Sequence, residues 1–166
     1  MMFKSIEWKE GTVRILNQTK LPHETVYEDC TDVEMVAHAI RSLFVRGAPA
    51  IGIAAAFGIA LSAHLCTATS FLSFQQEIEK AADLLAKTRP TAVNLFFAIS
   101  RMKETLKTNS EEAIPILKKI LLAEANAILN EDIAANRVMG KLGASFIGSG
   151  DGVLTYCNTG ALATGG

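Results

Sequence analysis

The sequence is poor in cysteine and holds no block of basic residues. Its 166 residues include three cysteines, Cys30, Cys66 and Cys157, none of them in a Cys-x-x-Cys pair. A sparse, odd set of this kind excludes a disulfide framework and a cysteine-based zinc site. Lys and Arg number 16 against 17 Asp and Glu, which gives a formal net charge of -1. Without a polybasic run, we expect no binding to nucleic acid or to an anionic membrane.

One long stretch has no charge at all. From Gly47 to Gln76 there is no Asp, Glu, Lys or Arg, and a transmembrane helix needs only about 20 apolar residues. The stretch is built mainly on Ala and Gly and contains Pro49 and His64, whereas membrane insertion favours Leu, Ile and Phe. We therefore predict a buried helix and no membrane span. Because the N-terminus also lacks the apolar core of a signal peptide, we expect a cytoplasmic protein.

After a β-rich start, most of the sequence has helical patterns. Apolar and β-branched runs predict strands at 12–16 and 24–27, joined by turn residues in a small antiparallel sheet. Apolar periodicity and breakers then predict helices at 31–45, from 49 onward, at 73–87, at 91–106 and from about 111 to about 140. Capping boxes are predicted at Thr31 with Glu34 and at Ser73 with Gln76, and a kink at Pro115.

The sequence changes character after residue 149. The apolar run Val153–Cys157 is typical of a strand in a parallel sheet that is buried on both faces. A Gly-rich turn follows it, which is the order in which a Rossmann-like α/β domain begins. We therefore predict an α+β protein. Its mainly helical N-terminal domain with a small antiparallel sheet covers 1–149, and 150–166 are the truncated start of a Rossmann-like domain.

Two arginines stand immediately before helices that begin with proline. They occur in Arg46-Gly47-Ala48-Pro49 and in Arg89-Pro90. The free N–H groups and the dipole of a helix N-terminus attract anions, and a guanidinium adds a bidentate contact, so both segments suit a phosphate group. From spacing alone, the alternative for each is the simpler one: Arg46 is a surface residue at an ordinary helix start and Arg89 an exposed loop residue.

Cys157 ends the predicted parallel strand, at the edge where open α/β sheets bind ligands. The residue is either a reactive thiol or a buried structural cysteine, and we interpret Cys30 and Cys66 as structural. The three histidines share no ligand spacing, and the Gly-rich tail lacks the Lys-Ser/Thr ending of a phosphate-binding P-loop. The sequence therefore predicts no metal site and no cofactor.

Taken together, four segments resemble one family. They are IEWK at 6–9, VRGAPAIGIAAAFG at 45–58, TRPTAVNL at 88–95 and GDGVLTYCNTGALATG at 150–165. Their order and spacing resemble those of the methylthioribose-1-phosphate isomerases, in a wider family that includes initiation factor 2B regulatory subunits and ribose-1,5-bisphosphate isomerase.

The resemblance implies an aldose–ketose isomerase of methionine salvage that acts on a small sugar phosphate, 5-methylthioribose 1-phosphate. Cys157 matches the catalytic cysteine of that family, and Arg46, Gly47, Ala48 and Arg89 match substrate-binding residues. The family's catalytic aspartate has no counterpart in these 166 residues, so we expect the chain to be the N-terminal part of a longer protein and inactive alone.

Two alternatives stay open at this point. One is a non-catalytic regulatory subunit of the initiation factor 2B type, and the other is a related ribose-1,5-bisphosphate isomerase. The resemblance also leaves room for a homodimer formed through a C-terminal domain.

Overall fold

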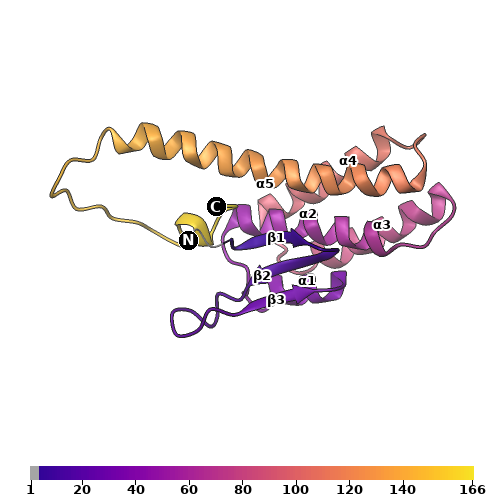
Figure 1. Ribbon diagram of the computed structural model, residues 1–166, viewed down its shortest axis with the longest axis horizontal. Coiled ribbons are helices and arrows are strands. Elements are labelled where there is room, and N and C mark those ends of the chain that lie inside the picture. The colour runs from indigo at the N-terminus through magenta and orange to yellow at the C-terminus, as the bar shows by residue number, and fades with distance from the viewer. Residues whose placement is uncertain (1–3) are drawn as a thin grey trace.

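The computed structural model describes residues 4–166 and is mostly helical (Figure 1). Met1–Phe3, where the predicted N-terminal domain would begin, lie outside the described residues. The strands are β1 (Ile6–Lys9), β2 (Thr12–Leu16) and β3 (Tyr27–Cys30), and the helices are α1 (Val33–Arg41), α2 (Ala48–Leu65), α3 (Phe71–Ala86), α4 (Val93–Thr108), α5 (Ile114–Ala144) and the short 3₁₀ helix η1 (Gly160–Leu162). The predicted combination of a small sheet with a mainly helical domain is confirmed.

The antiparallel sheet has the order β1-β2-β3, and its third strand lies later than predicted. β2 covers the predicted residues, but only Tyr27 of the run expected at 24–27 belongs to β3. The ladder pairs Val13 with Cys30 and Ile15 with Glu28. Val13, Ile15 and Cys30 are all buried. The strand therefore extends to Cys30 because that side chain completes the core face of the sheet.

Both predicted capping boxes are wrong by a few residues. Asp32, not Thr31, caps α1, with its carboxylate accepting from the Met35 N–H at 2.7 Å. Ser70, not Ser73, caps α3, and its hydroxyl accepts from the Ser73 N–H at 3.3 Å. The earlier start lets the first turns of α3 bury Phe74. Each error arises because several neighbouring residues can cap and burial selects one of them.

Helix α2 forms the centre of the protein. It is long and apolar enough to cross a membrane, but 72% of it is buried inside the structure. Helices α1, α3, α4 and α5 and the sheet pack around it. Its small residues allow this: a Cβ added at Gly58 would lie 3.2 Å from Val36 and 3.1 Å from Leu85. The prediction of a buried core helix is confirmed.

Helix α5 is the longest element and projects beyond the body of the protein (Figure 1). Pro115 lies in its first turn, so the predicted kink is wrong: a proline there displaces no helical hydrogen bond. The chain then returns along an irregular segment to η1, near the N-terminal strand. Val153–Cys157, predicted as the first strand of a parallel sheet, is exposed and pairs with no strand among residues 4–166. A strand exists only with a hydrogen-bonded neighbour.

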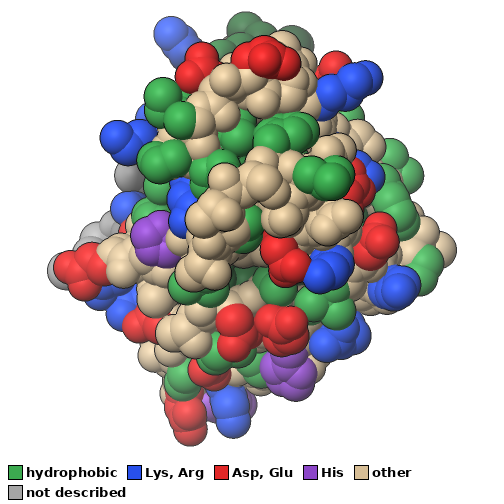
Figure 2. Space-filling view, turned by 90° about the vertical axis from the view of Figure 1, so that its right-hand side faces the viewer, with side chains coloured by type: hydrophobic (Ala, Val, Ile, Leu, Met, Phe, Trp, Pro, Cys, Tyr) green, Lys and Arg blue, Asp and Glu red, His purple; other side chains and the backbone are tan. Residues whose placement is uncertain are grey.

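Arg101 joins α4 to α5 by ion pairs. Its guanidinium donates to both carboxylate oxygens of Glu131, one of them at 2.7 Å, and to Glu124. The hydrogen bond from Arg101 holds the pKa of Glu131 below its ordinary value. Elsewhere, basic and acidic side chains are interspersed across the end of the molecule in Figure 2.

The pairing of Arg101 with Glu131 predicts a pH-dependent stability. Because the pKa of Glu131 is lowered on folding, its contribution is fully present above the ordinary value of 4.5 and is lost as the pH falls through the lower folded value. The Glu131 side chain is 60% exposed, so we expect a contribution of about 0.5–1 kcal/mol. Urea unfolding of the chain and of Glu131→Gln at neutral and acidic pH measures it. The difference between the two proteins should shrink in acid, and a constant difference would contradict the assignment.

Candidate functional site

The first turn of α2 has few N–H groups left for a ligand. Pro49 has none, and the Ala50 N–H donates to the Ala163 carbonyl at 3.1 Å. The Ile51 N–H is bound within the helix, to the Gly47 carbonyl at 3.0 Å. The N–H groups of Gly47 and Ala48 have no hydrogen-bond partner among the described residues. An anion at this helix start would therefore meet the residues that the sequence singled out.

Gly47 makes that arrangement possible. It precedes α2 with φ 94° and ψ 139°, a conformation that residues with a Cβ rarely adopt. A Cβ at this position would lie 2.5 Å from the Cα, Cβ and carbonyl oxygen of Ala163. Gly47 therefore lets the C-terminal turn that follows Cys157 pack directly against the start of α2. Arg46, the residue before it, is exposed to solvent.

The start of α4 lies beside the start of α2. A Cβ added at Gly52, in the second turn of α2, would lie 2.8 Å from the carbonyl oxygen of Asn94. Arg89 stands just before α4, and its Nη1 is buried without a hydrogen-bond partner among the described residues. A buried guanidinium nitrogen without an acceptor is costly unless a ligand supplies one. Arg89 lies four residues before Val93, the first residue of α4, so the prediction that Pro90 opens this helix is wrong; both arginine segments nevertheless precede adjacent helices.

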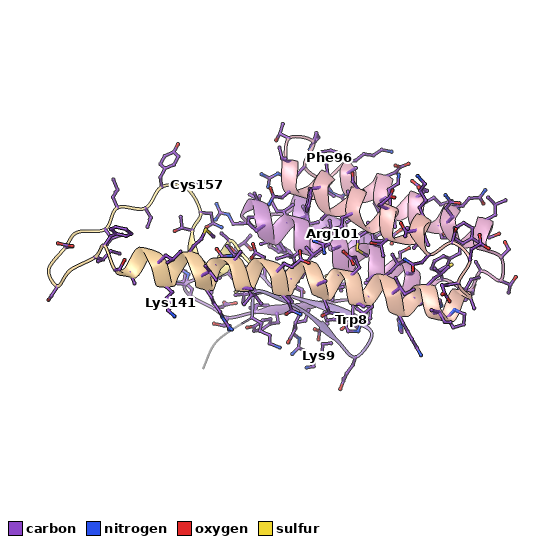
Figure 3. The ribbon with its side chains drawn as sticks, turned by 90° about the horizontal axis from the view of Figure 1, so that it is seen from above. Trp8, Lys9, Phe96, Arg101, Lys141 and Cys157 are labelled. Carbon is purple, nitrogen blue, oxygen red and sulfur yellow. The ribbon has the colours of Figure 1, made fainter. Side chains whose placement is uncertain are left out.

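Cys157 lies on the irregular segment that returns from the end of α5 (Figure 3). It is exposed and has a positive φ of 69°. The next residue, Asn158, is half-buried, and its Nδ2 is the other buried donor without a partner among the described residues. A non-glycine residue with positive φ often marks a functional position. The Cys157 thiol makes no hydrogen bond to Arg46 or Arg89 in the described part of the chain.

The turn after Cys157 is hydrogen-bonded to three further parts of the chain. The Ser5 hydroxyl donates to the Thr164 carbonyl at 3.1 Å, and Gln18 Nε2 donates to the Leu162 carbonyl at 2.7 Å. Asp132 on α5 accepts from the Gly165 N–H at 2.7 Å. Sequence reasoning missed these three residues. No local pattern marks them, because their partners lie 159, 144 and 33 residues away in the chain.

Phosphate binding is the chemistry that these groups fit. The helix start offers two N–H groups, the arginines offer positive charge, and the orphaned nitrogens of Arg89 and Asn158 require acceptors. Within residues 4–166 no group of three or more His, Cys, Asp and Glu side chains lies close enough to hold a metal ion. The Cys157 thiol, which precedes the C-terminal turn, is exposed.

Comparison with known proteins gives consistent matches. Residues 44–165 match the Initiation factor 2 subunit family. The chain is 46% identical over its full length to a methylthioribose-1-phosphate isomerase of Geobacter sp. (strain M21), of which it covers 48%. It is 47% identical over 98% of its length to the methylthioribose-1-phosphate isomerase of Desulforamulus reducens, of which it covers 47%.

Two solved structures share the fold. A 5-methylthioribose 1-phosphate isomerase of Pyrococcus horikoshii OT3 superposes with a TM-score of 0.94 at 43% identity, over 99% of this chain and 46% of that one. A structure described as translation initiation factor eIF-2B, subunit delta, of A. fulgidus gives a TM-score of 0.89 at 43% identity, over 99% of this chain and 47% of that one. The chain spans about half the length of the curated relatives that it matches. It belongs to the initiation factor 2 subunit family.

Proposed function

We propose that this chain supplies the N-terminal part of an aldose–ketose isomerase that converts 5-methylthioribose 1-phosphate into 5-methylthioribulose 1-phosphate. One observation carries the proposal. The turn directly after Cys157 is hydrogen-bonded to the first turn of α2, beside Gly47. The segment that carries the thiol is therefore joined to a helix start that suits an anion. The names of the relatives support the choice of this substrate over other sugar phosphates.

The phosphate group takes the start of α2. The N–H groups of Gly47 and Ala48 donate to its oxygens, and the Arg46 guanidinium neutralises its charge. The buried Nη1 of Arg89 finds its missing acceptor in the substrate. This anchoring leaves the sugar ring free to extend toward the Cys157 segment.

The reaction needs proton transfers at two substrate oxygens. The phosphate blocks the anomeric oxygen, so the ring opens by cleavage of the bond between C1 and the ring oxygen, which gains a proton. A hydrogen moves from C2 to C1, and the C2 hydroxyl loses its proton to become the ketone. Cys157 is one group that holds or transfers these protons. The resemblance places the second group, an aspartate, outside residues 4–166, so we expect the chain to bind the sugar phosphate without converting it.

Turnover and binding together test the proposal. The product of the complete open reading frame should convert 5-methylthioribose 1-phosphate, and the 166-residue chain should bind it without turnover, as measured by NMR and calorimetry. Preferential conversion of ribose 1,5-bisphosphate would identify the related isomerase instead. If the protein encoded by the complete open reading frame converts neither sugar phosphate, the result would favour a non-catalytic regulatory subunit. Turnover by the 166-residue chain would contradict the assignment of a required second group outside it.

Arg46→Ala should weaken binding of 5-methylthioribose 1-phosphate to the chain at least about tenfold, or about 1.4 kcal/mol. The substitution removes a charge-assisted contact to the phosphate and leaves the fold intact, because the side chain is exposed. Arg41→Ala, an exposed arginine at the end of α1, is the matched control and should leave the dissociation constant unchanged. Equal affinities for all three proteins, by titration calorimetry, would remove Arg46 from the site.

A further inference from the structure

Two polar side chains are buried beneath the C-terminal turn and hydrogen-bond to it. Ser5 is 2% exposed and Gln18 is 8% exposed. Both donate to carbonyl groups of this turn, Ser5 to Thr164 and Gln18 to Leu162. Burying a polar group costs free energy unless it is hydrogen-bonded, so the turn compensates for their burial.

Asp132 holds the same turn from the opposite side. Its Oδ2 accepts from the Gly165 N–H at 2.7 Å and from Asn136 Nδ2 at 3.1 Å. The Asn136 amide also donates to the Asp132 carbonyl, one helical turn before it, which orients both side chains. A Cβ added at Gly165 would lie 2.7 Å from Leu129 Cδ1. A side chain at position 165 would require the Leu129 side chain to shift, so the approach to α5 rests chiefly on the carboxylate of Asp132.

Apart from these contacts and the packing of Ala163 on the start of α2, nothing in the described structure restrains the segment that carries the thiol. Residues 145–159 have no helix or strand, and their apolar side chains, such as Leu154, are exposed. Cys157 precedes the docked residue Ala163 by six positions in the chain. At about 3.3 Å per residue, six residues span at most about 20 Å, so docking of Ala163 keeps the thiol within about that distance of the start of α2, and release of the turn removes this limit.

We propose that Asp132 and Gln18 are positioning residues that hold the turn Gly160–Gly166 against the start of α2 and so restrict where Cys157 lies relative to that helix start. The consequence for catalysis rests on the function proposed above, whereas the consequence for the location of Cys157 does not. Each of the two residues acts through a backbone group of the turn, and Asp132 does so with a charged acceptor, the stronger kind of hydrogen bond.

Energy transfer from Trp8 to a dye on Cys157 measures this location without any ligand. Trp8 is the single tryptophan. The parent protein carries Cys66→Ser, and Cys30 resists labelling because burial raises its pKa to about 12. We expect a narrow distance distribution in the parent and a broad one in Asp132→Ala. Asp132→Asn, which keeps an oxygen acceptor, should restore the narrow distribution, and Asn130→Ala, exposed on the same helix, should leave it unchanged.

Gln18→Met is a second variant, which keeps the side-chain length and removes the donor to Leu162. It should also broaden the distribution, while far-UV circular dichroism shows that the helices persist in each variant. A distribution as narrow in folded Asp132→Ala and Gln18→Met as in the parent would overturn the proposal. If one of these two variants unfolds, the distance distribution of the other still tests the proposal. Asp132→Asn must in either case give the same distribution as the parent.

A second readout links the position to the substrate. With Cys66→Ser as the parent, 5-methylthioribose 1-phosphate should slow alkylation of Cys157 by iodoacetamide, and half-protection in Asp132→Ala should need at least tenfold more ligand. Equal protection in both proteins would overturn the positioning role. If the ligand fails to protect even the parent, the proposed function is wrong, and the energy-transfer result still decides whether Asp132 and Gln18 locate Cys157.

Discussion

Gly47→Ala should destabilise the chain by about 3 kcal/mol and release the C-terminal turn from α2. The backbone conformation at Gly47, with φ 94°, costs a residue with a Cβ about 1–3 kcal/mol. The added methyl would also lie 2.5 Å from backbone atoms of Ala163. Relief of that overlap breaks the hydrogen bond from the Ala50 N–H, which is worth about 1 kcal/mol. Urea unfolding followed by circular dichroism measures the loss.

Gly140→Ala provides the matched control. Gly140 lies within α5, is exposed, and a Cβ there would meet nothing within 4 Å. Alanine should therefore stabilise the helix by about 0.5–1 kcal/mol. A decrease in the free energy of unfolding for Gly47→Ala and an increase for Gly140→Ala would show that the turn packs on α2 in solution. A Gly47→Ala protein as stable as the parent would contradict the close approach of Ala163.

Cys157→Ser should lower kcat for 5-methylthioribose 1-phosphate at least about tenfold, which is more than about 1.4 kcal/mol of transition-state stabilisation. Serine has nearly the same shape, but a hydroxyl gives up its proton far less readily than a thiol. Cys157 is exposed and no packed core surrounds it, so the substitution should leave the fold intact. The assay uses the product of the complete open reading frame and follows the ketose by NMR.

Cys66→Ser is the control for this substitution. Cys66 is half-buried just after α2, at the end of the helix opposite to Gly47, and its variant should keep the parent kcat. KM should change little in Cys157→Ser, because the proposed phosphate contacts come from Arg46 and the helix start and not from the thiol. An unchanged kcat in Cys157→Ser would remove the thiol from the reaction, whatever the effect on binding.

The helix starts at Pro49 and Pro115 show which features local sequence patterns predict. Proline in the first turn correctly predicted α2 at Pro49, yet the same residue type at Pro115 was interpreted as a kink. Both prolines occupy the one part of a helix that needs no N–H from them. The difference is that the polar residues before Pro115 also resemble a helix start. Local signals thus predict that a helix exists more reliably than where it begins.

The sequence alone determined the helices, the small sheet, the segments around Arg46, Arg89 and Cys157, and the resemblance to a family, because each is encoded in neighbouring residues. Only the tertiary structure decided that the turn after Cys157 packs on Gly47 and that Ser5, Gln18 and Asp132 hold it there. It also left Val153–Tyr156 without a strand partner among the described residues. Hydrogen bonds between distant parts of a chain carry no local signature, since folding selects their partners by burial.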